Sequence, residues 1–480
     1  MTKNNKVVLV YGNFNIIHPG HLRLLHFAKE LGNKLVVGVF TDKIAGNSAH
    51  ISQDLRLKNI ESISWVDESH LIDNDVSNFI NRLRPDIVVK GKEFENQINS
   101  ELDTIINYGG KLIFSSGESN FSTFDLINKE LSPNIKNKNN LPLDYLSTHD
   151  INIDDLISIV NKFSRIRALV LGDLIIDEYI TCDPIGMSQE DPTIVVTPVN
   201  NKLFIGGAGI VAAHASGLGA DVNFITISGN DQTYNYAKKS LNKFGVKTTI
   251  NIDESRPTTL KQRYRCKGVT LLRVSHLHQG MIEKQLQDKL LQQFTNLADS
   301  IDLLIFSDFN YGCLPNSLIN KIIEVAKKKN IFIVADSQSS SQIGDISRFQ
   351  KMDLITPTER EARLSVQDYD SGLIVLAEQL QNKSKCKNLL LKIGENGVLI
   401  HTYLSDEKKW ETDKIPALND SPKDVAGAGD SMLISSSLAL SVGANIWEAA
   451  LIGSIAASIQ VSRVGNEPIT YTEIIQYLNK

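Results

Sequence analysis

The chain alternates short apolar runs with amphipathic segments along most of its length. Apolar runs typical of buried parallel strands occur at residues 7–10, 34–40, 86–91 and 111–116. After the first run, large apolar residues recur at helical spacing from residue 22 to residue 31. This alternation predicts a doubly wound α/β sheet that binds ligands at the carboxyl ends of its strands.

A polar, irregular stretch separates two regions of this kind. Residues 131–150 are rich in Asn, Lys and Pro and lack apolar periodicity, which is typical of a linker. A chain of 480 residues is also too long for one ordinary core. We therefore expect an N-terminal α/β domain at residues 1–130, a linker at 131–150 and a larger α/β domain at 151–480.

The composition disfavours several classes of function. Hydrophobic content of 42%, 22% charged residues and a net charge of −5 are typical of a globular protein without a nucleic-acid or anionic-membrane partner. The four cysteines show no CxxC spacing, so we expect reduced thiols. Residues 432–461 are apolar but interrupted by polar residues, which predicts paired core helices rather than a membrane span. The first predicted strand follows a few polar residues, so we expect no signal peptide and a cytoplasmic enzyme.

The stretch YGNFNIIHPGH at residues 11–21 joins the first predicted strand to the first predicted helix. A helix start favours phosphate through its unpaired N–H groups and its dipole, and His18 and His21 can donate hydrogen bonds to phosphoryl oxygens there. Gly12 and Gly20 allow a close backbone approach. The alternative is a proline-initiated helix with two incidental histidines. The coincidence of strand, glycines, histidines and helix favours a phosphate site.

The stretch KDVAGAGDSM at residues 423–432 is the most specific motif in the chain. Gly427 and Gly429 place closely spaced backbone amides at the start of an apolar helix, which predicts an anion-binding nest. Asp430 stands at the helix entry, where it could accept the proton of an attacking hydroxyl. The alternative, that Asp430 only caps the helix, explains the aspartate but not the glycine pair.

Residues 11–21 resemble the GxFDxxHxGH signature of the cytidylyltransferase-like nucleotidyltransferases, and the stretches QDLRL, VKGKEF and SNFSTFDLI resemble further parts of that family. The resemblance implies a Rossmann-like domain in which a sugar or alcohol phosphate attacks the α-phosphate of a nucleoside triphosphate. It implies His18 and His21 as catalytic residues, and as nucleotide-binding residues Gly12, Asn13, Phe14, Gly20, Arg56, Lys90, Gly91, Ser122 and Thr123. Ser122 and Thr123 also fit a plain helix cap.

Two positions depart from that signature. Asn15 stands where the family has Asp, and the loop before Gly46 lacks the expected lysine. The triphosphate is then one positive charge short, which leaves a slow enzyme or a changed substrate as open outcomes.

Residues 423–432 and the glycine-rich stretch at 206–222 resemble the two signatures of the ribokinase-like (PfkB) sugar kinases. The resemblance implies a three-layer α/β/α fold that uses ATP and Mg²⁺, with Asp430 as the catalytic base. It implies nucleotide contacts from Ala426, Gly427, Ala428 and Gly429, and sugar-phosphate contacts from Asp173, Asp177, Glu190, Gly206, Gly207, Lys261 and Arg263. Glu361 would hold Mg²⁺ through a water. The basic stretch at 261–267 also fits a solvated sheet edge.

Together the two halves resemble the bifunctional heptose-7-phosphate kinases/heptose-1-phosphate adenylyltransferases, with the order of the halves swapped. This implies anomeric phosphorylation followed by nucleotidyl transfer to an ADP-heptose-like sugar. The resemblance also implies a homo-oligomer, a dimer through the second domain. Five positions of the kinase half depart from the family pattern: Ala426, Ile210, Tyr311, Ser275 and Thr358.

Alternatives to this function remain open. The kinase half alone could be active, with the first domain as a nucleotide-binding or regulatory module. Another sugar or polyol phosphate, or CTP in place of ATP, could be the substrate. A non-catalytic nucleotide-sensing scaffold is a third hypothesis, although a pure binder has no need of a catalytic base.

Overall fold

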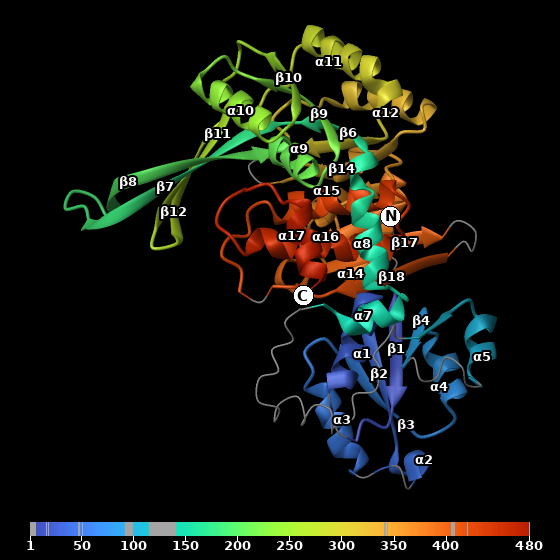
Figure 1. Cartoon of the computed structure of the whole chain (residues 1–480). Coiled ribbons are helices and arrows are strands. Elements are labelled where there is room, and N and C mark those ends of the chain that lie inside the picture. Colours follow the sequence, from blue (N-terminus) through green and yellow to red (C-terminus); the bar gives the residue numbers. More distant parts are fainter. Residues whose placement is uncertain are drawn as a thin grey trace. The chain divides into compact units, whose positions relative to one another are not determined.

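The structure is a computed structural model that describes residues 6–15, 17, 19–46, 49, 51–91, 99–114, 141–339, 342, 344–404, 409–419 and 421–479. The chain divides into two compact units (Figure 1). Unit 1 consists of residues 1–137 with 368–379, and unit 2 of residues 138–367 with 380–480.

Unit 1 is built on a five-stranded parallel sheet of order β3-β2-β1-β4-β5. Its central strands β2, β1 and β4 are apolar and largely buried, as is typical of parallel sheets. Leu9, Val36 and Val88 lie in its core and are fully buried. The strands are β1 (Val7–Gly12), β2 (Lys34–Phe40), β3 (Glu68–Ile72), β4 (Ile87–Lys90) and β5 (Lys111–Phe114).

Helices alternate with these strands, as the apolar pattern predicts. Helix α4 begins where the Asp75 side chain accepts a hydrogen bond from the Ser77 N–H, and it ends at Arg84 in a left-handed conformation. The helices of this region are α1 (Pro19–Glu30), α2 (Asp42–Ala45), α3 (Gln53–Glu61), α4 (Val76–Leu83) and α5 (Leu102–Asn107).

Unit 2 contains a nine-stranded sheet of order β10-β9-β6-β13-β14-β15-β16-β17-β18. It is parallel from β10 to β16, and β17 and β18 are antiparallel at one edge. Its strands are β6 (Arg167–Gly172), β9 (Asp221–Ser228), β10 (Lys247–Ile252), β13 (Leu303–Asp308), β14 (Phe332–Ser337), β15 (Leu354–Ile355), β16 (Asn388–Lys392), β17 (Val398–Leu404) and β18 (Lys409–Ile415).

A second, four-stranded sheet of unit 2 has the order β12-β11-β7-β8. Its long ribbons extend away from the nine-stranded sheet (Figure 1). The strands are β7 (Leu174–Met187), β8 (Ile194–Gly207), β11 (Thr259–Cys266) and β12 (Val269–His276).

Helices of unit 2 cover the large sheet. Helices α9, α15 and α16 pack together against its strands, and α10 to α13 pack against β10, β9, β14 and β16. The α-helices are α7 (Leu143–Thr148), α8 (Ile153–Asn161), α9 (Ala208–Gly217), α10 (Gln232–Lys243), α11 (Lys284–Leu297), α12 (Asn316–Lys328), α13 (Glu359–Val366), α15 (Ala428–Ser441), α16 (Ile446–Val461) and α17 (Tyr471–Leu478). Helix α14 (Leu373–Ser384) begins in the segment assigned to unit 1 and ends in unit 2. Short 3-10 helices are η3 (Phe163–Arg165), η4 (Ala298–Ser300), η5 (Ile346–Arg348) and η6 (Gly394–Asn396).

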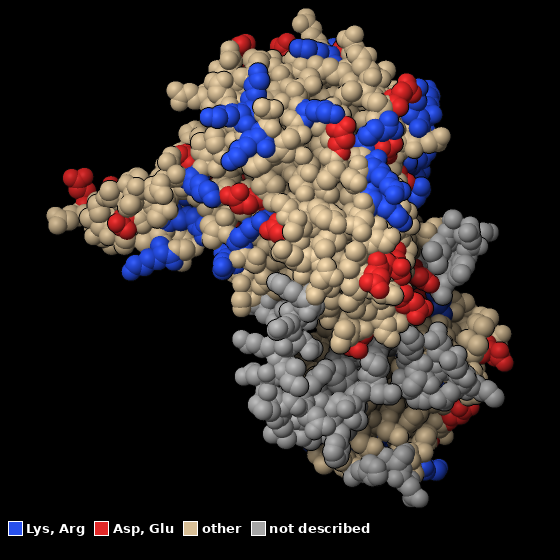
Figure 2. All heavy atoms as spheres, in the orientation of Figure 1, with Lys and Arg blue, Asp and Glu red and all other residues tan. Residues whose placement is uncertain are grey.

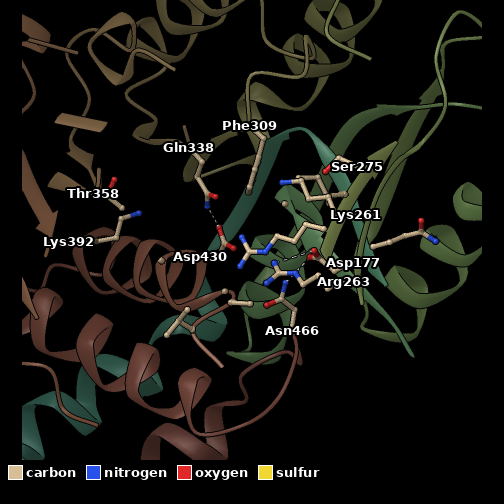
Figure 3. A pocket seen from close by; sticks show the side chains of 18 of the residues that line it. Asp177, Lys261, Arg263, Ser275, Phe309, Gln338, Thr358, Lys392, Asp430 and Asn466 are labelled. Atoms are coloured by element: carbon tan, nitrogen blue, oxygen red, sulfur yellow. Dashed lines mark hydrogen bonds and ion pairs between the residues drawn. The ribbon is translucent and has the colours of Figure 1, made fainter. Parts of the chain in front are cut away.

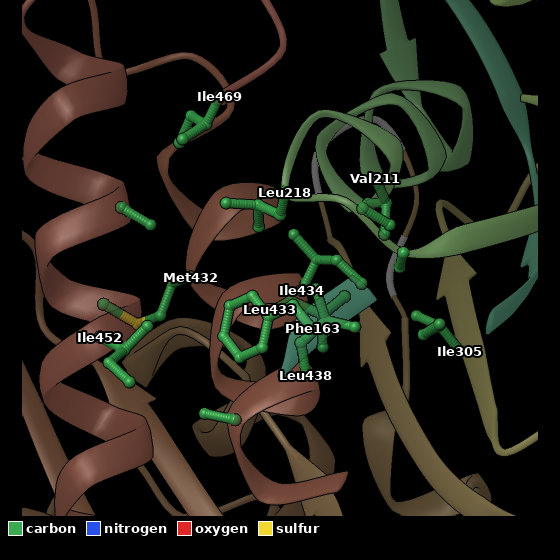
Figure 4. Close-up of a cluster of buried hydrophobic side chains, with 14 of the residues drawn as sticks. Phe163, Val211, Leu218, Ile305, Met432, Leu433, Ile434, Leu438, Ile452 and Ile469 are labelled. Atoms are coloured by element: carbon green, nitrogen blue, oxygen red, sulfur yellow. The ribbon is translucent and has the colours of Figure 1, made fainter. Parts of the chain in front are cut away.

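The centre of unit 2 is a large apolar core that surrounds α15. All residues of this helix from Asp430 to Ala439 are buried, and Leu433 and Ile434 pack with Phe163 and Ile452 (Figure 4). Burial of a leucine or isoleucine side chain stabilises a fold by about 1.5–3 kcal/mol. Helices α15 and α16 pack against each other, as the interrupted apolar stretch predicts. In the described part of the chain, no helix has both the length and the apolar character needed to span a bilayer.

Helix α7 differs from the expected linker. Residues 143–148 are helical, and Tyr145 and Leu146 are buried in the core of unit 2. The Tyr145 hydroxyl donates a hydrogen bond to the Trp447 carbonyl at 2.9 Å. Two adjacent apolar residues in a polar stretch give too weak a periodic signal to indicate this packing. The predicted linker residues 131–140 lie outside the described residues.

Candidate functional site

A cavity of about 420 Å³ opens in unit 2 beside the carboxyl ends of β14 and β16 (Figure 3). Its other walls come from β11 and β12 of the small sheet and from the start of α15. Open α/β sheets bind ligands at this end of their strands. The cavity brings together nine of the residues predicted from the sequence: Asp177, Gly207, Lys261, Arg263, Glu361, Ala426, Gly427, Gly429 and Asp430. Gly206 and Ala428 are chain neighbours of this set.

Two glycines shape the turn that leads into α15. Gly427 is left-handed, with φ of +77°, and a Cβ there would lie 2.4 Å from Asn466 Oδ1. A Cβ on Gly429 would lie 3.0 Å from Lys392 Nζ. Because neither glycine carries a side chain, the first N–H groups of α15 lie beside the cavity, where the helix dipole favours an anion.

Asp430 lies in the first turn of α15 and is 6% exposed. The Gln338 side-chain amide donates a hydrogen bond to Asp430 Oδ1 at 3.1 Å. Burial, followed by the neighbouring Asp336 carboxylate, raises the pKa of Asp430 to about 7. A carboxylate with this pKa suits a general base that works near neutral pH.

Lys392 and Asp336 form a buried ion pair in the same cavity wall. Lys392 Nζ lies 3.1 and 3.2 Å from the two Asp336 carboxylate oxygens, and the side chains are 13% and 2% exposed. Burial lowers the pKa of Lys392, but the Asp336 and Glu361 carboxylates more than offset this, so its pKa is raised. Lys392 is therefore an ammonium cation at neutral pH.

Asp177 marks the opposite end of the cavity, on the small sheet. Arg263 lies 3.5 Å from Asp177 Oδ1, and the Asn466 amide donates to Asp177 Oδ2 at 3.3 Å. Burial raises the pKa of Asp177 although Arg263 opposes the shift. A Cβ on Gly206 would lie 2.4 Å from Asp177 Oδ2, so a side chain there would displace this carboxylate. Lys261 and Arg263 share one face of β11 and give this end positive charge.

Asp173 and Glu190 do not line the cavity. The Asp173 carboxylate accepts hydrogen bonds from the backbone N–H groups of Phe309, Tyr311 and Cys313, at 2.8, 3.4 and 3.2 Å. It therefore fixes the loop after β13. Glu190 is exposed in the loop that joins β7 to β8. Sugar contacts by these two residues stay predictions.

Glu361 has a local structural task. Its carboxylate accepts from the backbone N–H of Ser339 at 2.9 Å and of Thr358 at 2.7 Å, and it forms a capping box with Thr358. In the described residues, no group of three or more His, Cys, Asp or Glu side chains is placed to hold a metal ion. These residues therefore do not fit a resident metal, and Mg²⁺ stays a prediction for an ion that arrives with the triphosphate.

Unit 1 holds Arg56 in a fully buried position. Its guanidinium donates to the Ile51 carbonyl at 2.8 Å, to the Asn13 carbonyl at 2.8 Å and to Asp42 Oδ1 at 2.6 Å. These three contacts tie the turn after β1 to α2 and α3. A phosphate contact by Arg56 stays a prediction, because its partners here belong to the protein.

Lys90 at the end of β4 belongs to a second polar cluster of unit 1. Its ammonium donates to Asn99 Oδ1 and Glu101 Oε1, both at 2.6 Å, and the Tyr11 hydroxyl donates to the same Glu101 oxygen. Burial raises the pKa of Glu101, but the hydrogen bonds from Lys90 and Tyr11 outweigh it, so the pKa is lowered. Lys90 thus already has an anionic partner.

The predicted phosphate turn of unit 1 is described in part. Phe14 is buried and left-handed, with φ of +49°, and its ring lies 5.1 Å from that of His21. Gly12 ends β1 and Gly20 lies in the first turn of α1. Gly91 directly follows β4. The predicted residues His18, Ser122 and Thr123 lie outside the described residues.

Comparison with known sequences separates the two units in the same way. Residues 167–470 match the sequence model of the pfkB family carbohydrate kinases. The chain belongs to the pfkB family. Residues 9–128 match the cytidylyltransferase-like model, so the nucleotidyltransferase-like unit precedes the kinase unit, as predicted.

Several relatives are named bifunctional protein HldE. The chain is 30% identical to that of Helicobacter hepaticus over 320 residues, which are 65% of this chain and 64% of the relative. It is 30% identical to that of Campylobacter fetus subsp. fetus over 64% of this chain and 66% of the relative. The chain therefore spans slightly less than two thirds of the relatives that it matches.

Solved structures confirm the predicted ribokinase-like fold. Phosphofructokinase-2 from Escherichia coli, in complex with substrates and products, has a TM-score of 0.53 at 16% identity, over 65% of this chain and 98% of its own. Ribokinase from Arabidopsis thaliana, complexed with ribose and ATP, has a TM-score of 0.51 at 16% identity, over 66% and 99%.

The residues of the cavity that were not predicted from the sequence include Gln338, Lys392, Asn466 and Arg273. Lys392 could have been predicted from the sequence, because it is a single charged residue at the carboxyl end of the apolar strand NLLLK, where open α/β sheets bind ligands. Asn466 had none, since it comes from an irregular segment far away in sequence.

Replacement of Gly427 by alanine should destabilise unit 2 more than replacement of Gly443. Both glycines are left-handed, with φ of +77° and +97°, but a Cβ on Gly443 has no atom within 4 Å. We expect Gly427→Ala to lower the free energy of unfolding by about 1–3 kcal/mol more than Gly443→Ala, because of the clash with Asn466. Urea denaturation measures the difference, and equal losses would contradict the turn geometry.

Proposed function

We propose that the chain phosphorylates the anomeric hydroxyl of a sugar phosphate with ATP and then transfers a nucleotidyl group to the new phosphate. The observation that carries the kinase step is Asp430 beside the glycine turn, in one cavity with Asp177 and Arg263. The resemblance to the heptose enzymes and the relatives named bifunctional protein HldE support an ADP-heptose-like product.

The kinase step uses the two ends of the cavity. Asp177 accepts hydrogen bonds from sugar hydroxyls, and Lys261 and Arg263 hold the phosphate already on the sugar. The anomeric oxygen attacks the γ-phosphorus of ATP while its proton passes to the Asp430 carboxylate. The bond from the γ-phosphorus to the β–γ bridging oxygen breaks, and ADP leaves with that electron pair. The amides at residues 427–429 support the phosphoryl group in transfer.

The second step belongs to unit 1. An oxygen of the sugar 1-phosphate attacks the α-phosphorus of the nucleoside triphosphate, and pyrophosphate leaves with the electron pair of the broken α–β bond. His21, with His18, donates hydrogen bonds to the α-phosphate oxygens. Positioning and charge stabilisation supply the catalysis, since no covalent enzyme intermediate is needed.

A second candidate function makes unit 1 a nucleotide-binding or regulatory module. Two observations favour this function. First, Arg56 and Lys90, the cations predicted to contact phosphate, already form ion pairs with Asp42 and Glu101. Second, Asn15 lacks the negative charge of the aspartate that the family has at this position. Pyrophosphate release separates this candidate from the first.

Asp430→Asn should abolish the kinase step. With ATP, Mg²⁺ and D-glycero-D-manno-heptose 7-phosphate, we expect ADP formation to fall roughly 10²- to 10⁴-fold, the usual contribution of a general base. Since the pKa of Asp430 is raised to about 7 and the base acts in its ionised form, wild-type kcat should rise with pH through about 7.

Asp299→Asn is the matched control, because that side chain is 78% exposed on the surface of unit 2. It should keep wild-type activity. Full activity of Asp430→Asn, or a wild-type rate that falls as pH rises from 6 to 8, would contradict the assignment. No ADP with any of a panel of sugar phosphates would contradict the kinase function itself.

His21→Ala should abolish pyrophosphate release and leave ADP formation unchanged. The assay supplies the sugar 1-phosphate directly, with ATP or CTP, and a coupled enzyme detects pyrophosphate. His26→Ala is the control, because His26 lies in the same helix, is 56% exposed and pairs with Glu30. Absence of pyrophosphate from the wild type with both nucleotides would favour the binding-module function.

We also propose that the kinase unit pairs through its projecting sheet. Apolar side chains that are 56–69% exposed cluster on these ribbons: Ile185, Met187, Ile194, Val199, Val269 and Leu272. Figure 2 shows that much of the projecting sheet carries uncharged atoms on the face in view. A patch of this kind is typical of a protein interface, and a second copy of the chain would cover it.

Charges on the ribbon should then prevent pairing. We expect Met187→Lys with Ile194→Lys to convert a wild-type dimer into a monomer, as measured by light scattering after size exclusion. Ile106→Lys is the control, because Ile106 is 61% exposed but lies in α5 of unit 1. A wild type that is monomeric at micromolar concentration would overturn this proposal.

A further inference from the structure

Lys392 lies at the meeting point of three elements that surround the glycine turn. Its ammonium pairs with Asp336 of β14, and its Nζ lies beside Gly429 at the start of α15. Its backbone N–H donates a hydrogen bond to the Pro357 carbonyl at 2.8 Å. The buried strand β16 fixes its backbone. These contacts therefore fix the position of the Lys392 side chain.

The ammonium has a donor left for a ligand. A lysine ammonium carries three N–H donors, and the Asp336 carboxylate lies within 3.2 Å with both oxygens. In the described part of the chain, no other hydrogen bond to Lys392 Nζ is present. At least one N–H is thus available toward the cavity that Lys392 lines.

The distribution of charge gives Lys392 a different ligand from that of the other cations. Lys261, Arg263 and Arg273 also line the cavity, but all three come from the small sheet, where Asp177 lies. Lys392 comes from the large sheet, beside the turn whose amides favour an anion (Figure 3). Asp430 belongs to that turn, between the two sources of positive charge.

We propose that Lys392 is a catalytic residue that hydrogen-bonds the γ-phosphate of the nucleotide and follows it during transfer. This inference rests on the proposed kinase function. The anomeric oxygen forms its bond to the γ-phosphorus, the bond to the β–γ bridging oxygen breaks with its electron pair going to ADP, and the hydroxyl proton goes to Asp430. Lys392 keeps its own protons throughout and offsets charge on the phosphoryl oxygens. Asp336 holds the ammonium in place.

Nucleotide binding tests this role without any sugar. Titration calorimetry of the full chain compares ADP with β,γ-imido-ATP, a non-hydrolysable analogue that carries the γ-phosphate, both with Mg²⁺. We expect the wild type to bind the analogue more tightly than ADP. Lys392→Met should weaken binding of the analogue roughly tenfold or more and change ADP binding less than about twofold, because only the analogue reaches Lys392.

Controls separate a contact with the phosphate from a structural effect. Lys387→Met removes a lysine that is 71% exposed just before the same strand and should match the wild type. Lys392→Arg keeps the charge and should keep part of the preference for the analogue. If Lys392→Met does not fold because Asp336 is left unpaired, Lys392→Met with Asp336→Asn removes both charges, and the same loss of preference is expected.

Two results would overturn the inference: no preference for the analogue in the wild type, or equal preference in the wild type and in the methionine variant. Loss of the preference in the variant supports it even if no sugar phosphate is turned over, so its failure and that of the proposed kinase function are distinguishable. Where turnover is measured, Lys392→Met should lower kcat roughly 10²- to 10³-fold and leave KM for the sugar phosphate near its wild-type value.

Discussion

The burial of α15 is the constraint on which the cavity of unit 2 depends. Every residue of this helix from Asp430 to Ala439 is buried, whereas Ala428 and Gly429 at its start are half-buried. The unpaired N–H groups of a helix start are costly in such a place unless they meet an anion. The glycine turn at residues 427–429 leaves these groups beside a cavity rather than against the core. The packing that stabilises the unit thus also places a turn that favours an anion at the cavity.

Burial also determines the pKa values of the charged groups in the cavity. Burial raises the pKa of both Asp430 and Asp336, and the Asp336 carboxylate raises that of Asp430 further. Lys392 offsets this negative charge, and Asp336 in turn keeps Lys392 protonated. A base with a pKa near 7 therefore arises from the balance of three groups rather than from any one of them. The Asp336 carboxylate thus offsets the cost of burying the Lys392 ammonium.

The two units differ in how their cations are used. In unit 1, Arg56 and Lys90 donate to carboxylates and carbonyls of the protein itself, at 2.6–2.8 Å. In unit 2, Lys261 and Arg263 line a cavity, and Arg263 lies 3.5 Å from Asp177 Oδ1. Positive charge that lines a cavity suits an incoming phosphate, whereas the paired cations of unit 1 must first exchange their partners.

The alternation of apolar runs was enough to predict both α/β units, because buried parallel strands and amphipathic helices leave strong periodic signals. The glycine turn and Asp430 were equally evident, since their residue types are rare in that order. Asp173 shows where such inference ends. The resemblance to the sugar kinases implied a contact between Asp173 and sugar, which stays a prediction, while the structure shows that its carboxylate accepts hydrogen bonds from three backbone amides of the loop after β13. A buried aspartate serves either purpose, and only the partners brought by distant segments decide between them. Asn466 is likewise placed at the cavity by contacts between segments that are distant in sequence, and no local sequence pattern predicts such contacts.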